Sequence, residues 1–178
     1  MSDSLDHPAD GLPTSPDGLF AHLNGLGIET QTVSHPPLFT VEDSQSLRGE
    51  IAGGHIKNLF VKDKKGKVFL IVVEEDATVD LKTIHTLIGG SGRVSFGKPE
   101  LLMELLGVRP GSVSPFGLIN DTGGIVTCIL DEKLMRHDVL NCHPLVNTMT
   151  TSIPRDDLKR FIESTGHTAN IVAVSSGN

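Results

Sequence analysis

The sequence predicts one α+β domain, built on a curved, mixed and mostly antiparallel sheet that is flanked by helices. The chain has 178 residues, which suits a single domain with a real core. The strands that its apolar pattern predicts are mainly paired as hairpins, and single helices separate the hairpins. The regular strand–helix alternation of a doubly wound sheet is missing. We expect residues 15–178 to form this domain and residues 1–14, which are polar and contain proline, to form a flexible tail.

Helix starts and stops define the first half of the domain. Ser15-Pro16-Asp17 is a helix start and Gly27 ends the apolar helical spacing that follows. The run Val68–Val73 is apolar on both faces, which is typical of a central strand. The expected elements are a helix over 15–26, a strand over 28–33, a short helix over 40–51, a hairpin of 55–62 with 67–75, a helix over 80–88, a strand over 93–96 and a helix over 98–106.

The second half is expected to contribute another hairpin and the closing helix. Asp121-Thr-Gly-Gly124 has the composition of a hairpin turn. Pro154 begins a helix whose buried face carries Leu158, Phe161 and Ile162. The expected elements are strands over 116–120 and 125–130, a short helix over 132–137, strands over 139–143 and 148–153, a helix over 154–165 and a strand over 170–174.

The charge balance limits the possible partners. A formal net charge of −7 argues against broad electrostatic coating of nucleic acid, although a local patch could still hold one RNA end. Such a patch exists at Lys57, Lys62, Lys64, Lys65 and Lys67, where the alternative is an ordinary solvated hairpin tip. The absence of Trp and Tyr disfavours stacking of several bases.

The cysteines and histidines indicate neither a metal site nor a thiol nucleophile. Cys128 and Cys142 each lie in an apolar run without a CxxC pair, and no secretory leader or long apolar span is present, so we expect a reduced, cytoplasmic protein. Cys142 and His143 are adjacent and would point to opposite faces of a strand. The eight histidines include no HExxH. We expect no metal, cofactor, membrane or DNA.

Lys57 is the most informative single residue. Within Ile56–Val61, strand alternation places Lys57 on the same face as Leu59 and Val61, which should be largely apolar. A lysine there needs an anion, a hydrogen-bond network or a changed protonation state, so it is a candidate site residue. The alternative is a lysine that snorkels to water near the strand end.

The segment Gly111-Ser-Val-Ser-Pro115 is a second candidate. Pro110-Gly111 has the residue order of a type II turn, and the loop that follows should be stiff with several free N–H groups that could bind an anion. The alternative is a plain connection. Asp121-Thr-Gly also occurs in aspartic proteases, but those need a second such aspartate and the sequence has no second Asp-Thr-Gly, so the turn interpretation is favoured.

Several segments together resemble the YbaK/ProRS-associated editing domains, the family that includes the INS-like domains. The lysine followed by Asn-Leu-Phe and Asp-Lys-Lys-Gly is most similar to the free-standing Ala-tRNA(Pro) deacylases, ProXp-ala or PrdX. The matching segments cover nearly everything after the tail: His35-Pro-Pro-Leu-Phe-Thr-Val-Glu42, Lys57-Asn-Leu-Phe-Val-Lys-Asp-Lys-Lys-Gly66, Gly111-Ser-Val-Ser-Pro-Phe116, Ile119-Asn-Asp121 and Asn141-Cys-His-Pro-Leu145.

This resemblance implies an aminoacyl-tRNA editing fold that hydrolyses the ester of mischarged tRNA(Pro) without a metal. Such an ester needs a positioned water and a stabilised oxyanion rather than a strong nucleophile. Lys57 would bind the terminal phosphate or polarise the carbonyl, and we favour the first role because an amine that meets an anion stays charged. The implied catalytic residues are Lys57, Gly111, Ser112, Val113, Ser114 and Pro115, and the implied substrate-binding residues are Asn58, Phe116, His143 and Lys62.

The resemblance leaves the amino acid and the partners open. Exclusion by size can separate alanine from proline, whereas cysteine or serine on the tRNA remain alternative substrates. A non-catalytic module that binds tRNA or a synthetase is a further alternative. The expected partner is the 3′ end of mischarged tRNA(Pro), with transient contact to prolyl-tRNA synthetase or an elongation factor.

Overall fold

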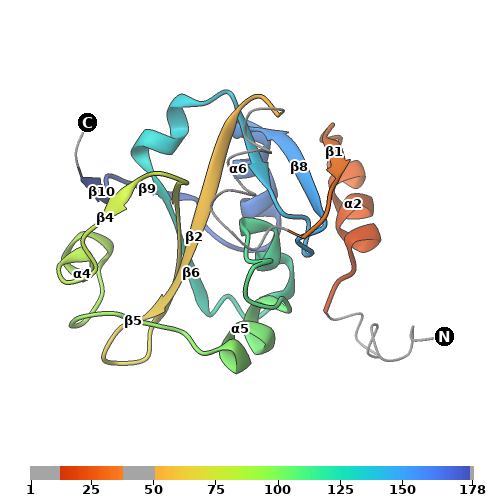
Figure 1. Cartoon of the computed structure of the whole chain (residues 1–178). Coiled ribbons are helices and arrows are strands. Elements are labelled where there is room, and N and C mark those ends of the chain that lie inside the picture. Colours follow the sequence, from red (N-terminus) through yellow and green to blue (C-terminus); the bar gives the residue numbers. More distant parts are fainter. Residues whose placement is uncertain (1–12, 38–50, 177–178) are drawn as a thin grey trace.

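The chain folds around a strongly twisted mixed sheet (Figure 1). The computed structural model describes residues 13–37 and 51–176. Its helices are α2 (Pro16–Gly25), α4 (Ile84–Ile88), α5 (Pro99–Leu106) and α6 (Arg155–Ser164), with 3-10 helices η1 (Pro115–Asn120) and η2 (Glu132–Arg136). Its strands are β1 (Gln31–Ser34), β2 (Gly54–Lys62), β3 (Val68–Glu74), β4 (Thr78–Val79), β5 (Ser95–Phe96), β6 (Val126–Asp131), β7 (Val139–Cys142), β8 (Met149–Pro154), β9 (Asn170–Val172) and β10 (Ser175–Ser176).

The main sheet has the order β1-β8-β7-β2-β3-β6-β9, and β5 pairs separately with β2. Hairpin β2–β3 is antiparallel, as are pairs β1–β8, β7–β8 and β2–β5. Crossovers make β2–β7, β3–β6 and β6–β9 parallel. The sheet is therefore mixed, as expected from the mixture of hairpins and single helices along the chain.

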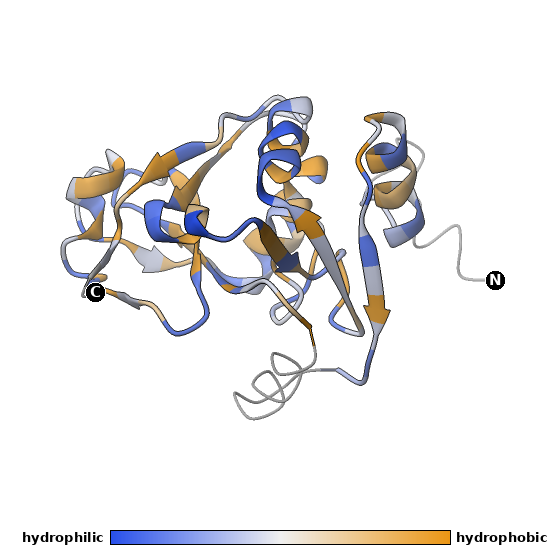
Figure 2. Ribbon diagram, turned by 90° about the horizontal axis from the view of Figure 1, so that it is seen from above, coloured by the Kyte–Doolittle hydropathy of each residue, from blue (hydrophilic) through white to orange (hydrophobic). Residues whose placement is uncertain are grey.

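Strand β3 lies at the centre of two apolar cores because both of its faces are covered. Val68, Leu70 and Val72 pack into the larger core with residues of α2, α5, η1 and α6. Phe69, Ile71 and Val73 pack into the smaller core with residues of α4. Figure 1 shows α4 on one side of the central strands and α5 and α6 on the other, and Figure 2 shows apolar residues both along strands and on helices.

Several predicted boundaries need correction. Residues 116–120 form helix η1 and not a strand, because Ser114 caps the helix and Pro115 occupies its first turn. The strand expected at 28–33 is displaced to Gln31–Ser34, and α4 begins only at Ile84. The last long strand is shortened to Asn170–Val172.

Two further expectations concern the ends of the described ranges. The helix expected over 40–51 lies almost entirely outside the described residues. Most of the expected tail, residues 1–14, also lies outside them. At its end, the Thr14 N–H donates to Asn120 Oδ1 at 2.7 Å. Within residues 13–37 and 51–176, no helix combines the length and apolarity needed to span a membrane.

Candidate functional site

The candidate site lies along β2, where one edge of the strand has no ladder partner over residues 56–59 in the described part of the chain; this stretch is called the open edge below. In the described residues β7 pairs with Gly54 and His55, whereas β5 pairs with Val61 and Lys62, so residues 56–59 have a ladder partner only in β3. The Phe60 carbonyl accepts from the Gly97 N–H on the β5 side. Because backbone groups alternate between strand edges, the N–H and C=O of Asn58 also point to this open edge.

Lys57 and Asn58 point to opposite faces of the sheet, as strand alternation predicts. Lys57 pairs with Val73, which belongs to the smaller core, and its ammonium donates to the Ala77 carbonyl at 2.6 Å. Asn58 pairs with Val72 of the larger core. The structure therefore confirms the apolar surroundings expected for Lys57 and shows a backbone carbonyl as one of its partners.

The Asn58 amide is the direct link between β2 and the loop at 111–115. Its Nδ2 donates to the Val113 carbonyl at 2.9 Å, which fixes the orientation of the amide. The other amide atom, Oδ1, is buried and accepts no hydrogen bond from the described residues. A buried acceptor without a donor is costly unless a ligand or water supplies one, so Oδ1 is a ligand-binding candidate.

The predicted turn at Pro110-Gly111 is present. Gly111 has φ +93°, which a type II turn requires at its third position, and the Ser112 N–H closes the turn by donating to the Arg109 carbonyl at 3.0 Å. The Ser112 N–H is therefore occupied, contrary to the expectation of a free donor there. The backbone N–H groups of Gly111, Val113 and Ser114 remain candidate donors to a ligand.

Ser114, Pro115 and Phe116 hold the loop in place. The Ser114 hydroxyl donates to the His143 carbonyl at 2.6 Å and accepts the Phe116 N–H at 3.2 Å, so this fully buried serine positions two segments. Phe116 lies in the core, edge-on to Phe161 with ring centroids 5.3 Å apart. Ser114, Pro115 and Phe116 are all buried, so their side chains hold the loop from within the fold, and the roles expected of these residues toward the substrate stay predictions.

His143 follows β7 beside the same loop. Its Nδ1 lies 3.0 Å from the Met149 carbonyl, which can only accept, so Nδ1 carries the proton and Nε2 is the acceptor nitrogen of the neutral ring. Burial lowers the pKa of His143, and the nearby His35 lowers it further against the opposing effect of the Met149 carbonyl. His143 is therefore neutral at pH 7 and presents Nε2 as a hydrogen-bond acceptor.

His35 is the neighbour of His143 that sequence reasoning assigned no individual role. The two ring centroids are 6.3 Å apart. The His35 Nδ1 faces the Pro36 carbonyl and its Nε2 faces the Thr150 hydroxyl, both at 2.8 Å. Both ring nitrogens of His35 thus have partners within the protein, whereas His143 Nε2 has none among the described residues.

Lys62 lies on the same face of β2 as Asn58, because the two are four residues apart in a regular strand. The adjoining hairpin tip is held by Asp63, whose carboxylate accepts the N–H groups of Lys65, Lys67 and Ser91. The Ser91 N–H, followed by those of Lys67, Lys65 and Gly66, lowers the Asp63 pKa against the opposing effect of burial. The lysines at 64, 65 and 67 are exposed on this ordered tip.

The structure thus brings together Asn58, the Gly111–Ser114 loop and His143, and it places Lys62 farther along the same face. It does not bring the Lys57 ammonium to the loop. The Ser-Pro pair at 114–115 was the available signal for a helix cap, whereas no sequence pattern indicated the Val113 and Met149 carbonyls. Burial raises the thiol pKa of both Cys128 and Cys142 to about 12, and the described residues contain no cluster of three or more His, Cys, Asp or Glu suited to a metal.

This combination defines a class of site: an open strand edge with amide, imidazole and loop N–H groups beside it, a set of groups suited to a polar ligand. The aminoacyl-tRNA editing domain family matches residues 35–161 of the sequence, which include all of these groups. The chain belongs to this family.

Its relatives extend over most of the chain. It is 39% identical over 153 residues to the prolyl-tRNA synthetase associated domain-containing protein 1 of Danio rerio, covering 85% of this chain and 83% of the relative. It is 32% identical over 151 residues to the prolyl-tRNA editing protein ProX of Acetoanaerobium sticklandii, covering 84% and 92%. A crystal structure described provisionally as a trans-editing enzyme for prolyl-tRNA synthetase has the same fold, with a TM-score of 0.71, 22% identity and coverage of 93% and 99%.

Proposed function

We propose that this chain is a trans-editing aminoacyl-tRNA deacylase that hydrolyses the ester of mischarged tRNA(Pro), with Ala-tRNA(Pro) as its preferred substrate. Family membership supports the editing reaction. The observation that carries the site assignment is the contact of Asn58 with Val113, which joins β2 to the loop next to the buried, unpartnered Oδ1. Cysteine or serine esters are the alternative substrates of the same site.

In the proposed reaction, water attacks the ester carbonyl carbon, the bond to the ribose oxygen breaks, and the ribose oxygen takes up a proton. N–H groups at Gly111, Val113 and Ser114 would stabilise the oxyanion, because preorganised donors act most strongly where charge develops. Asn58 Oδ1 and His143 Nε2 are acceptors, so they suit the ammonium of the amino acid, a ribose hydroxyl or the attacking water.

Lys57 is better placed to bind phosphate than to polarise the ester carbonyl. Its ammonium lies on the face opposite Asn58 and already donates one hydrogen bond to Ala77, which leaves two of its three N–H donors. A 3′ end that crosses the open edge at residues 56–59 could place a phosphate near Lys57 and the ester near Asn58. Lys62 would then meet a phosphate on the Asn58 side.

The decisive experiment is deacylation of Ala-tRNA(Pro) beside Cys-, Ser- and Pro-tRNA(Pro), with wild type, Asn58→Ala and Lys57→Ala. We expect chelator-insensitive multiple turnover that is fastest on the alanine ester and is strongly reduced in both variants. A preference for cysteine or serine would retain the chemistry and change the substrate. Binding of tRNA without turnover of any ester would instead identify a non-catalytic module and overturn the proposal.

The partners follow from this substrate. The 3′ end of mischarged tRNA(Pro) is the proposed direct partner, and prolyl-tRNA synthetase or an elongation factor would meet the protein only transiently, as carriers of the same tRNA. No group in the proposed reaction needs a cofactor.

A further inference from the structure

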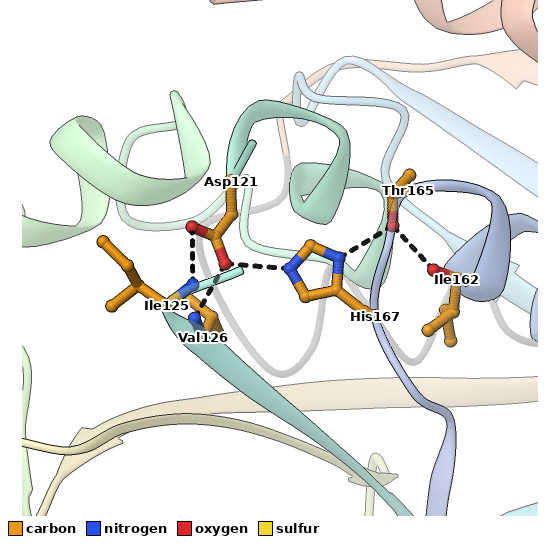
Figure 3. Close-up of polar contacts among 6 residues, drawn as sticks. All are labelled: Asp121, Ile125, Val126, Ile162, Thr165 and His167. Atoms are coloured by element: carbon orange, nitrogen blue, oxygen red, sulfur yellow. Dashed lines mark hydrogen bonds and ion pairs between the residues drawn. The ribbon is translucent and has the colours of Figure 1, made fainter. Parts of the chain in front are cut away.

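A buried polar cluster outside the loop at 111–114 joins the turn before β6 to the C-terminal segment (Figure 3). Asp121 precedes β6, and His167 follows α6. The His167 Nε2 lies 2.8 Å from Asp121 Oδ2, and both side chains are 2% exposed. The proposed reaction uses neither residue.

The hydrogen bonds around this cluster determine where its protons lie. Asp121 Oδ1 accepts the Ile125 N–H and Oδ2 accepts the Val126 N–H. Hydrogen bonds from two backbone N–H groups favour the ionised carboxylate, and an ionised Oδ2 can only accept from the His167 ring. The Nε2 of His167 therefore carries a proton.

The second ring nitrogen also carries one. The Thr165 hydroxyl oxygen lies 2.7 Å from the Ile162 carbonyl, and two oxygens this close need a hydrogen between them, which the hydroxyl supplies. The same hydroxyl oxygen lies 2.8 Å from His167 Nδ1. Since its only proton is committed to Ile162, the hydroxyl must accept from Nδ1.

We propose that His167 is a buried imidazolium, and that its ion pair with Asp121 is a proton-dependent latch for the C-terminal segment, residues 167–176. Two carboxylates fasten this segment at the two ends of β6. Asp121 holds His167, whereas Asp131 accepts the Val174 N–H at 3.0 Å and the Ser175 hydroxyl at 2.6 Å. Between them, β9 pairs with β6 over Ile129–Asp131.

The surroundings of the ring contain one charged partner. Among the described residues, Asp121 is the charged group that contacts His167, and its other contacts are the neutral Thr165 hydroxyl and Ile162 carbonyl. The other histidine attached to the end of α6 is His22, whose Nε2 faces the Ser164 hydroxyl at 2.8 Å. Loss of the ring proton or protonation of Asp121 would each remove the charge pairing and release the latch.

The first test is NMR spectroscopy of the ¹⁵N-labelled full chain at pH 7. We expect two slowly exchanging ring N–H signals from His167, assigned by their loss in His167→Gln. A single Nε2–H with an unprotonated Nδ1 would overturn the proposal. If His167→Gln does not fold, Thr165→Val and Thr165→Ser make the assignment, because only the serine variant retains the Nδ1 acceptor.

Hydrogen exchange on the same two variants tests the latch itself. In Thr165→Val we expect protection of residues 167–176 to fall by about tenfold or more, the effect of losing a charge-assisted hydrogen bond, while β3 keeps its protection. Thr165→Ser should match wild type. In wild type, raising the pH should release residues 167–176 selectively, after correction for intrinsic exchange. Equal loss across β3 and residues 167–176, or none in either, would contradict a latch.

Discussion

Alternation along β2 separates two neighbouring residues into different chemical roles. Lys57 extends into the smaller core and reaches the Ala77 carbonyl, whereas Asn58 reaches Val113 on the other face. In the proposed reaction the ester contacts Asn58 directly, and a contact of Lys57 with the same group would require the substrate to cross the strand edge. Substitutions at these two positions should affect different parts of the reaction.

Asn58→Asp should reduce deacylation more than Asn58→Ala. The alanine variant loses the Val113 hydrogen bond and the Oδ1 acceptor, for which we expect a fall in kcat/KM of about 10- to 100-fold. The aspartate variant places a carboxylate oxygen against the Val113 carbonyl, so it also displaces the loop. Steady-state kinetics on Ala-tRNA(Pro) measure both, and an aspartate variant as active as wild type would refute the role of this amide.

Protonation of His143 should lower both the stability and the activity of the protein at acidic pH. Because burial lowers its pKa below the ordinary 6.5, His143 stays neutral in the fold while the unfolded chain already binds the proton. Stability from this residue is therefore present above about pH 6.5 and lost as the pH falls through the lower folded value. Deacylation that uses Nε2 as an acceptor should decline over the same acidic range.

Urea unfolding and kcat/KM measured between pH 5 and 8 test this prediction. We expect His143→Gln to flatten both pH dependences, because glutamine does not titrate. His22→Gln is the control, since His22 is a half-buried histidine that contacts Ser164 and Phe161 and lies outside the proposed site. If stability and activity fell at acidic pH in His143→Gln as they do in wild type, another group would be responsible for the decline.

At the level of elements, the site depends on helix η1. Ser114 caps this helix while its hydroxyl donates to the His143 carbonyl, so one side chain sets the distance between the loop and the end of β7. Ser15 caps α2 in the same way, because its hydroxyl accepts the Gly18 N–H and a proline follows it. Its role is limited to this cap. The two serines therefore form a matched pair.

Ser114→Ala should lower both stability and activity, whereas Ser15→Ala should lower stability only. Loss of a cap costs about 1 kcal/mol, and the unpaired His143 carbonyl at Ser114 adds about 1–3 kcal/mol. Urea unfolding and kcat/KM on Ala-tRNA(Pro) measure the two effects. Equal activity in the two variants would show that Ser114 has no role in positioning the site.

Elements that depend on local pattern were predictable, and those that depend on distant contacts were not. The β2–β3 hairpin, α5 and α6 follow from apolar periodicity and from proline at the helix starts. The short apolar run at 116–120 was assigned to a strand because periodicity cannot separate a strand from one buried turn of helix, although Ser114-Pro115 carried the capping signal.

For the candidate site, the structure shows where the predicted residues lie, and their roles stay predictions. Asn58, His143 and the loop at 111–114 do lie together, whereas Phe116 is in the core and Lys57 faces away. Strand alternation gave the direction of Lys57 correctly. The Val113 and Met149 carbonyls were out of reach of sequence reasoning, because backbone acceptors are the same in every residue type and their position depends on the tertiary fold.

For the whole molecule, binding of tRNA must overcome a net charge of −7. The basic residues at 62, 64, 65 and 67 are concentrated on the β2–β3 hairpin, and Asp63 holds the backbone of its tip through three N–H groups. At about 3.3 Å per residue, Lys62 lies about 13 Å from Asn58 along the strand. If the ester binds at Asn58 as proposed, phosphates upstream of it would pass these lysines.

Binding of tRNA(Pro) should therefore weaken steeply as the salt concentration rises. The slope of log K against log salt should depend on the number of hairpin lysines that contact phosphates. Each phosphate contact contributes about 0.9 to the slope of log K against log salt in duplex regions and about 0.7 in single strands. Lys62→Gln and Lys65→Gln should each reduce the slope by up to this amount. Lys82→Gln, an exposed lysine preceding α4 on the other side of the sheet, is the control. Fluorescence titrations between 50 and 200 mM salt measure the slopes, and identical slopes in all four proteins would place the tRNA on another surface.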